Sequence, residues 1–184
     1  GLTDVARYEL DDHDVMALAR YADGAGLGSL VLQAGERSDA GFVERVERLV
    51  ARIKEASDGR LGITLSLGEQ SRETYARWRA AGAHRYLLRI ETSDPVLFAR
   101  LHPSAQRFED RLACLRLLRE TGYQVGTGVL IGVPGQTAAH LARDVLFYRR
   151  MDIDMIGMGP YLPHPGTPLA GQSDGFDPVR QLRL

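Results

Sequence analysis

The sequence IGMGPYLPHPGTPLA at residues 156–170 decides the fold class, because a short apolar run there ends abruptly in a loop rich in glycine and proline. Four earlier segments have the same form: LVLQAGE (30–36), ITLSLGE (63–69), YLLRIETSDP (86–95) and TGVLIGVPGQT (127–137). Each strand-like run is followed by a helix-like stretch, and this alternation indicates parallel strands joined by helices. The sequence therefore predicts a parallel α/β sheet or barrel.

The stretches beside these runs carry the apolar spacing of amphipathic helices. We expect helices over 11–26, 39–56, 71–81, 94–100, 109–120 and 137–149, with one more beginning in 176–184. The first is expected to bury Val15, Leu18, Ala19 and Ala22. About five parallel strands with flanking helices in 184 residues predict a partial (β/α)8 TIM-type barrel, since eight units usually need more than about 200 residues. An open Rossmann-like sheet is the alternative, but no G-x-G-x-x-G follows any of the runs.

Composition and charge exclude several classes of protein. The 23 basic and 24 acidic residues give no basic surface for nucleic acid. No apolar run approaches the roughly 18 residues of a membrane span, so we expect no membrane partner and a cytoplasmic location. The single cysteine, Cys114, fits a reducing compartment and cannot by itself supply a multi-cysteine metal site. We expect residues 1–184 to form a single domain.

Acidic residues close the first two runs. Gly35 would let a ligand approach the backbone and Glu36 would hold an ammonium group, unless the pair is a plain turn with a solvated carboxylate. Ser66 and Glu69 close the second run in a matching pattern. Because parallel strands end at the same edge, the two carboxylates are expected to face one cavity, with a turn again as the alternative.

Charged residues also close the third run. Arg89 and Glu91 lie two positions apart, so both would point to one face, as a ligand-binding pair or an internal salt bridge. Arg111, in the next helical stretch, would either reach a carboxylate with two nitrogens or lie on the surface. These residue types indicate a polar site but define no reaction.

Glycine and proline dominate the ends of the last two runs. Gly132 and Pro134 form a tight turn before a helix, which suits an anion or simply a strand–helix connection. Tyr161 and His164 lie in a segment stiffened by three prolines, 160, 163 and 165, as expected of a cavity wall. A histidine such as His164 is, taken alone, more typical of the surface.

Taken together and in this order, the segments resemble the HydE family of radical S-adenosylmethionine (SAM) maturases of FeFe-hydrogenases. The resemblance rests on VLQAGE, TLSLGE, RYLLRIETSDPVLFARLHP, GVLIGVPGQT and DMIGMGPYLPHPGTPLA. It extends over nearly the whole chain. Biotin synthase and methylornithine synthase are related families, but the QAGE, LSLGE and PHPGTPLA segments look more like the maturase.

The resemblance implies a (β/α)8 barrel that binds SAM and a 4Fe–4S cluster held by C-x3-C-x2-C. It implies reductive cleavage of SAM to methionine and a 5′-deoxyadenosyl radical. In this family the radical acts on a small organometallic precursor during assembly of the hydrogenase active-site subcluster. The implied partners are therefore a small-molecule or organometallic substrate and other hydrogenase maturases.

The resemblance also gives roles to the candidate residues. Gly35 and Glu36 match the segment that meets the SAM amino group. Glu91 matches the acidic residue that binds the SAM ribose, and Arg111 matches the arginine that holds the SAM carboxylate. The remaining residues would position substrate or line the cofactor cavity: Ser66, Glu69 and Arg89 for the substrate, and Gly132, Pro134 and Tyr161 for the cofactor.

The chain departs from the family pattern at its start. C-x3-C-x2-C is absent, and Gly1–Leu2 resemble the residues that follow the last cluster cysteine. We therefore expect the central portion of a radical SAM barrel, without the cluster loop and the last strands, that cannot do radical chemistry alone. The alternatives are a methylornithine synthase-like or biotin synthase-like radical enzyme, a clusterless module that binds SAM or a nucleoside, and, more weakly, a phosphate-binding barrel enzyme.

Overall fold

A computed structural model describes residues 8–166, 169–170 and 172, and the helix expected in 176–184 lies outside them. The described strands are Ser29–Gln33 (β1), Gly62–Ser66 (β2), Arg85–Leu87 (β3), Gln124–Ile131 (β4) and Met155–Pro160 (β5). They form one parallel sheet in the order β1-β2-β3-β4-β5. A strand order that follows the chain is that of a barrel wall, whereas a Rossmann-like sheet reverses its order at a switch point. The predicted barrel-type α/β fold is confirmed.

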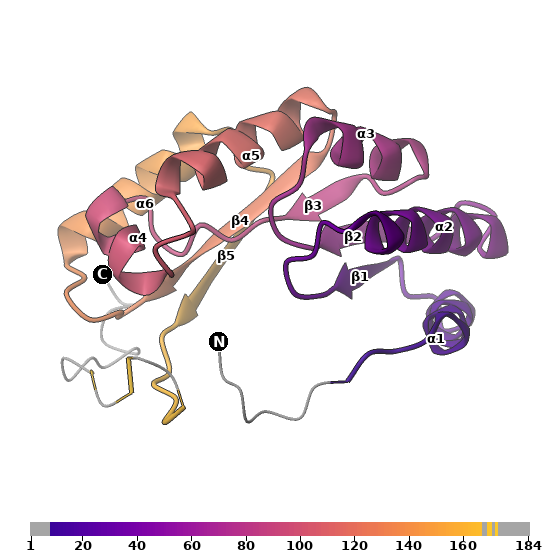
Figure 1. Ribbon diagram of the computed structural model, residues 1–184, viewed down its shortest axis with the longest axis horizontal. Coiled ribbons are helices and arrows are strands. Elements are labelled where there is room, and N and C mark those ends of the chain that lie inside the picture. Colours follow the sequence, from indigo (N-terminus) through magenta and orange to yellow (C-terminus); the bar gives the residue numbers. More distant parts are fainter. Residues whose placement is uncertain (1–7, 167–168, 171, 173–184) are drawn as a thin grey trace.

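Helices flank the sheet in alternation with its strands. They are α1 (Asp12–Gly24), α2 (Ala40–Ala56), α3 (Arg72–Ala80), α4 (Pro95–Leu101), α5 (Phe108–Glu120) and α6 (Ala138–Arg150). Figure 1 shows α2, α3, α5 and α6 along one side of the sheet. Within the described residues, no helix covers the opposite side. No helix there is long and apolar enough to cross a bilayer.

Side-chain caps fix where several helices begin. Asp11, Asp39, Ser71 and Asp94 each accept a hydrogen bond from a backbone N–H in the first turn of the helix that follows. Proline at the first position of α4 suits a helix start, because its missing N–H has no helical partner there. These local signals explain why the predicted helices lie within two residues of the observed ones.

The buried face of α1 differs from the prediction. Leu18, expected inside, is 57% exposed, and Met16 is buried instead with Ala19 and Ala22. Helix α1 packs mainly against helix α2 and the sheet edge at β1. A helix held against one edge buries a narrower stripe than one lying over the middle of a sheet.

The two faces of the sheet differ sharply in composition. Residues in register on neighbouring strands point to the same face. The helix-covered face carries large apolar side chains: Leu30, Leu32, Ile63, Leu65, Tyr86, Val125 and Val129. The open face carries polar side chains and glycines, interrupted by the apolar residues Val31, Leu87, Leu130 and Met155. The polar residues and glycines are Ser29, Gln33, Thr64, Ser66, Arg85, Gly126, Gly128, Gly157 and Gly159. The core therefore lies between sheet and helices, and the other face is free for polar contacts.

Strand β3 is shorter than predicted. The run 86–92 pairs as a strand only through Leu87, and Glu91 rejoins the sheet as an isolated bridge to Val129. Between them, the Ile90 N–H donates to the Thr127 hydroxyl at 3.1 Å instead of to a strand backbone. Arg89 and Glu91 therefore lie beyond the end of the strand.

Candidate functional site

The site lies where the five strands end. All strands are parallel, so their carboxyl ends meet at one edge of the sheet, which in such folds binds ligands. The segments leaving that edge are 34–39, 67–71, 88–94, 132–137 and 161–166. Two carboxylates and one backbone carbonyl from the first three segments converge here on α5.

Arg111 is the centre of this convergence. It lies in the first turn of α5 and is only 6% exposed, so it is not the surface residue that its position alone would indicate. Its Nη2 is 3.0 Å from Glu36 Oε1, and its Nε is 2.7 Å from Glu69 Oε1. Its Nη1 donates to the Arg89 carbonyl oxygen at 3.2 Å. The planar guanidinium thus joins the loops after β1, β2 and β3.

Glycine is required at position 68, beside the Glu36 side chain. A Cβ on Gly68 would lie 2.2 Å from Glu36 Cγ, and the backbone there has φ of +75°. A Cβ on Gly35 would meet no described atom within 4 Å. Gln106 completes the contacts of this carboxylate by donating its Nε2–H to Glu36 Oε2 at 2.7 Å. Gly68 is therefore the residue that allows Glu36 to approach Arg111.

The Arg111 group carries a net negative charge. Two carboxylates, Glu36 and Glu69, surround one guanidinium. Burial raises the pKa of Glu69, and the charge of Arg111 only partly opposes this. Arg111 Nε and Glu69 Oε1 are close, but neither atom completes a hydrogen bond among the described residues. The contact is therefore an ion pair with poor hydrogen-bond geometry. A cationic ligand group would relieve the excess charge.

The second charged group is the pair of Arg89 and Glu91. Arg89 Nε lies 3.0 Å from Glu91 Oε1, so the two side chains meet as predicted, although beyond the strand. Burial raises the pKa of Glu91, and the charge of Arg89 opposes that shift. Glu91 Oε2 is buried and has no hydrogen-bond partner in the described structure. An unpartnered buried carboxylate oxygen is costly and accepts hydrogen bonds from a ligand.

The backbone at Glu91 is strained. Glu91 has φ of +60°, and the Thr92 N–H donates to the Ile90 carbonyl oxygen at 2.7 Å. A two-residue hydrogen bond closed around a positive φ is a γ-turn of the rare, strained kind. Such conformations in a residue other than glycine persist where the surroundings impose them, and they gather at ligand sites.

His102 lies near both charged groups. Its ring stacks on Phe98 with centroids 3.8 Å apart, and its Nδ1–H donates to the Phe98 carbonyl oxygen at 3.0 Å. Burial lowers the pKa of His102, which favours the neutral ring. Nδ1 as the donor leaves Nε2 as the acceptor of that ring.

The remaining predicted residues lie at the same edge but make no described contact with the charged groups. Gly132 has φ of +88°, and its N–H donates to Gln136 Oε1. Tyr161 donates its hydroxyl to the Leu169 carbonyl oxygen at 3.2 Å. Ser66 and Pro134 are half-buried, and His164 is exposed. Their cofactor and substrate roles stay predictions.

Several site residues carried no clear sequence signal of function. They are Gly68, His102 and Gln106, together with Asp144, which is buried on α6 and accepts hydrogen bonds from the N–H and hydroxyl of Ser93. Asp144 is detectable in retrospect, because it occupies a core position of the apolar stripe of α6 together with Phe147. Gly68 has the same position in LSLGE as Gly35 has in LQAGE, so the sequence does not distinguish them. They differ in the structure, because the Glu36 side chain lies against Gly68.

The residues at this edge fit SAM but not its cluster. A carboxylate such as Glu91, with a free acceptor oxygen, suits a ribose diol, and the excess of carboxylate around Arg111 suits an ammonium group. A 4Fe–4S cluster needs three thiolates, and the chain holds one cysteine. That cysteine, Cys114, is half-buried on α5, where burial raises the pKa of its thiol.

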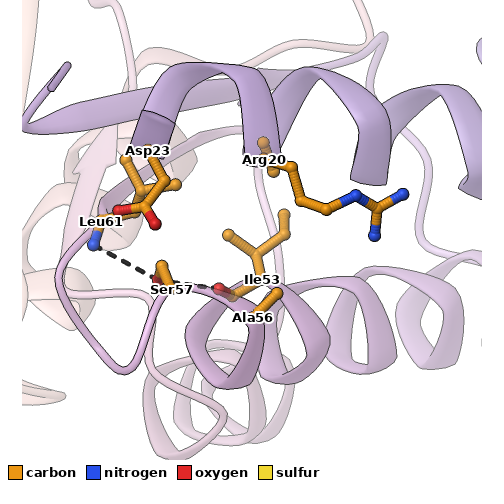
Figure 2. Close-up of a pocket in the computed structure, with 7 residues that line it drawn as sticks. Arg20, Asp23, Ile53, Ala56, Ser57 and Leu61 are labelled. Atoms are coloured by element: carbon orange, nitrogen blue, oxygen red, sulfur yellow. Dashed lines mark hydrogen bonds between the residues drawn. The ribbon is translucent and has the colours of Figure 1, made fainter. Parts of the chain in front are cut away.

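A crevice between α1 and α2 is separate from this site. Figure 2 shows Asp23 and Ser57 at one end of it and Ile53 within it. Its lining comes from these two helices and Leu61, just before β2, none of which leaves the carboxyl edge of the sheet. It therefore adds nothing to the charged groups described above.

The fold and the site define an α/β barrel wall with an acidic, arginine-centred ligand edge. Comparison with known proteins gives the family. Residues 3–147 match the radical SAM superfamily. The chain is 44% identical to the [FeFe] hydrogenase maturase subunit HydE of Thermotoga maritima, over 92% of this chain and 47% of that protein.

Two further relatives agree. The chain is 29% identical to 3-methylornithine synthase of Methanosarcina acetivorans, over 90% of this chain and 47% of that protein. A crystal structure of methylornithine synthase superposes with a TM-score of 0.84 at 29% identity, over 95% of this chain and 51% of that one. The chain belongs to the radical SAM superfamily, which confirms the resemblance. It spans about half the length of the relatives it matches.

Proposed function

We propose that this chain is the SAM-binding central portion of a radical SAM maturase resembling HydE. The proposed substrate is a small, organometallic precursor of the FeFe-hydrogenase subcluster. Other hydrogenase maturases are the proposed partners, in the cytoplasm. The 44% identity to HydE supports this maturase over the other radical enzymes.

One observation carries the ligand assignment: Glu91 is held in a strained turn with a buried, unpartnered oxygen at the ligand edge. A SAM ribose would donate its two hydroxyl groups to this carboxylate. Arg111, which already bridges Glu36 and Glu69, would take the SAM carboxylate in exchange for part of those contacts. Glu36 would then be free for the SAM ammonium group.

When bound, SAM and a reduced 4Fe–4S cluster supply a 5′-deoxyadenosyl radical. The residues of this chain would bind and orient SAM, while the cluster thiolates come from outside it. Ser66 and Arg89 lie on the open face or beside it, where Arg89 is 44% exposed at its side chain. They would contact the substrate above the sheet together with Glu69. Gly132, Pro134 and Tyr161 would line the cofactor cavity.

The test uses the complete gene product that carries this chain, reconstituted with iron and sulfide under anaerobic conditions. SAM affinity is measured by calorimetry, and 5′-deoxyadenosine is measured after addition of a reductant. We expect Glu91→Gln to weaken SAM binding about tenfold or more, the scale of a lost hydrogen-bonded charge. Glu55→Gln, an exposed change on α2, is the matched control. Unchanged SAM affinity in Glu91→Gln would refute the assignment.

A clusterless SAM- or nucleoside-binding module is the second candidate, and the single cysteine favours it. It predicts SAM binding to the complete gene product without an absorbance typical of an iron–sulfur cluster and without 5′-deoxyadenosine. A methylornithine synthase-like or biotin synthase-like enzyme predicts cleavage of SAM with a different product. Analysis of the product therefore separates the three candidates.

A further inference from the structure

We propose that Asp144, a buried carboxylate on α6, is a positioning residue that holds the γ-turn at Glu91 in its ligand-binding form. The inference rests on the proposed function, since it takes Glu91 as a SAM contact. Neither the sequence pattern of the site nor its charged groups include Asp144. It acts through the backbone that follows Glu91.

The contact is direct and double. Asp144 is fully buried, and its Oδ1 accepts from the Ser93 N–H at 2.7 Å and from the Ser93 hydroxyl at 2.6 Å. Ser93 lies two residues after Glu91 and one residue after the N–H that closes the turn. A single carboxylate oxygen therefore fixes the exit of the chain from the turn, and hydrogen bonds to an ionised acceptor are stronger than neutral ones.

Strand β4 holds the turn from the other side. The Glu91 N–H donates to the Gly128 carbonyl oxygen at 2.8 Å, and the Leu130 N–H donates to the Glu91 carbonyl oxygen at 3.0 Å. A strained conformation persists only when its surroundings fix it from several directions. Strand β4 supplies backbone contacts, and α6 supplies the carboxylate of Asp144.

Burying the Asp144 carboxylate costs free energy, which a residue that serves only to fill space would not require. Its Oδ2 is buried without a hydrogen-bond partner, and so is the hydroxyl of Tyr148 one turn later, among the described residues. No ion pair of Asp144 is described, and burial raises its pKa. An apolar residue would fill this place on α6 at lower cost, as Phe147 does nearby. The carboxylate is therefore explained by what it holds, the turn at Glu91.

Two kinds of substitution separate the acceptor from the charge. Asp144→Asn keeps the size and the Oδ1 acceptor and removes the charge. Asp144→Ala removes the acceptor as well. Ser93→Ala removes only the hydroxyl bond and keeps the backbone bond, so it is the milder variant if Asp144→Ala fails to fold. All are made in the complete gene product.

Hydrogen–deuterium exchange of the segment 90–95 and SAM affinity are the readouts. We expect about tenfold faster exchange of this segment and about tenfold weaker SAM binding in Asp144→Ala, the scale of releasing one strained residue. Asp144→Asn is expected to stay within about threefold of the wild type, and Ser93→Ala to lie between the two. Wild-type exchange of the segment in both Asp144→Ala and Ser93→Ala would overturn the proposal.

A double-mutant cycle with Glu91→Ala tests whether the effect passes through Glu91. If it does, Asp144→Ala has no further effect on SAM affinity in the Glu91→Ala background. An equal loss in both backgrounds would mean a general structural role and overturn the proposal. If Glu91→Ala alone leaves SAM affinity unchanged, the assignment of Glu91 to SAM fails, while the exchange of segment 90–95 still decides whether Asp144 holds the turn.

Discussion

The two charged groups at the ligand edge are built in opposite ways. The guanidinium of Arg111 already contacts protein groups, namely Glu36, Glu69 and the backbone carbonyl of Arg89. Glu91 lies in a strained turn and keeps a buried oxygen without a partner. Most contacts of the first group are already made within the protein, whereas the second keeps a buried acceptor for a ligand.

This difference separates two tasks at one site. A ligand that binds Arg111 must displace contacts the protein already has, so little affinity is gained there. A ligand that binds Glu91 adds hydrogen bonds where none existed, so the gain is larger. Arg111 thus acts as the frame that joins three loops, and Glu91 acts as the acceptor. The predictions below test this division, beginning with the frame.

Removing the frame has the largest combined effect, because it lowers stability and abolishes SAM binding together. Arg111→Gln leaves Glu36 and Glu69 as facing carboxylates without a cation. We expect a loss of about 2–3 kcal/mol in the free energy of unfolding, reduced from the value for fully buried pairs because both carboxylates are partly exposed. SAM binding should be lost as well, because the loops after β1, β2 and β3 are no longer joined through Arg111. Denaturant unfolding measures the first effect, and Arg116→Gln, exposed on the same helix, is the control.

Gly68→Ala should disturb the contact between Glu36 and Arg111 through the loop that carries Gly68. The added methyl would lie 2.2 Å from Glu36 Cγ at a φ of +75°, so Glu36 must move away from Arg111. We expect a loss of about 2–4 kcal/mol in unfolding free energy from strain and overlap together. Gly35→Ala is the matched control, since its Cβ meets no described atom within 4 Å. Equal melting temperatures for the two variants would contradict this account of Glu36.

Gly128→Ala should disturb the turn at Glu91 without changing the contacts of Arg111. Its methyl would lie 2.6 Å from the Gly157 carbonyl oxygen, which forces β4 away from β5, and the Gly128 carbonyl is the acceptor for the Glu91 N–H. We expect a loss of about 1–3 kcal/mol in unfolding free energy and weaker SAM binding. Gly157→Ala, whose Cβ is 3.9 Å from its nearest neighbour, should fold normally. Calorimetric melting of both variants checks the contrast.

Glu91→Gln should have the smallest effect on stability, and the size of the effect depends on pH. The raised pKa of Glu91 means that the folded state binds its proton more tightly than the unfolded chain. The ionised carboxylate therefore destabilises the fold at neutral pH, and this cost falls as the pH drops through the raised pKa toward its ordinary value near 4.5. We expect Glu91→Gln to be more stable than the wild type at pH 7, with the difference shrinking toward pH 5.

Asp39→Asn gives the opposite sign and serves as the reference. The Phe42 N–H lowers the pKa of Asp39 at the start of α2, so its ionised form stabilises the fold. Wild-type stability should exceed that of Asp39→Asn at neutral pH and fall toward it as the pH drops below about 4. Thermal melts at several pH values measure both variants. Parallel pH profiles for the two would refute the sign assigned to Glu91.

Much of the fold could be predicted from the sequence because its signals are local. Gly, Pro and capping residues mark where strands and helices end, and parallel strand ends must meet at one edge. That was sufficient to bring Glu36, Glu69, Arg89 and Glu91 together. The resemblance to the HydE family predicts a role for Arg111, whereas its position in the sequence alone predicts a surface residue.

The rest depends on contacts between distant parts of the chain. Arg111 is 75 residues from Glu36, and Asp144 is 51 residues from Ser93. Burial of Arg111 and the turn at Glu91 exist only when those parts meet. After β3 ends at Leu87, the Ile90 N–H donates to the hydroxyl of Thr127, 37 residues away, so the apolar run 86–92 could not reveal the end of the strand.

The open face of β4 and β5 has a consequence for what can lie on it. Gly128, Gly157 and Gly159 leave bare peptide planes there, whereas the side chains of Met155 and Leu87 lie over Gly126. A flat group can rest directly on such a surface at van der Waals distance, whereas a bulky group gains no extra contact. The glycines of β4 and β5 therefore select a ligand by its flatness and shape. The residues Arg111 and Glu91 select it by its charge.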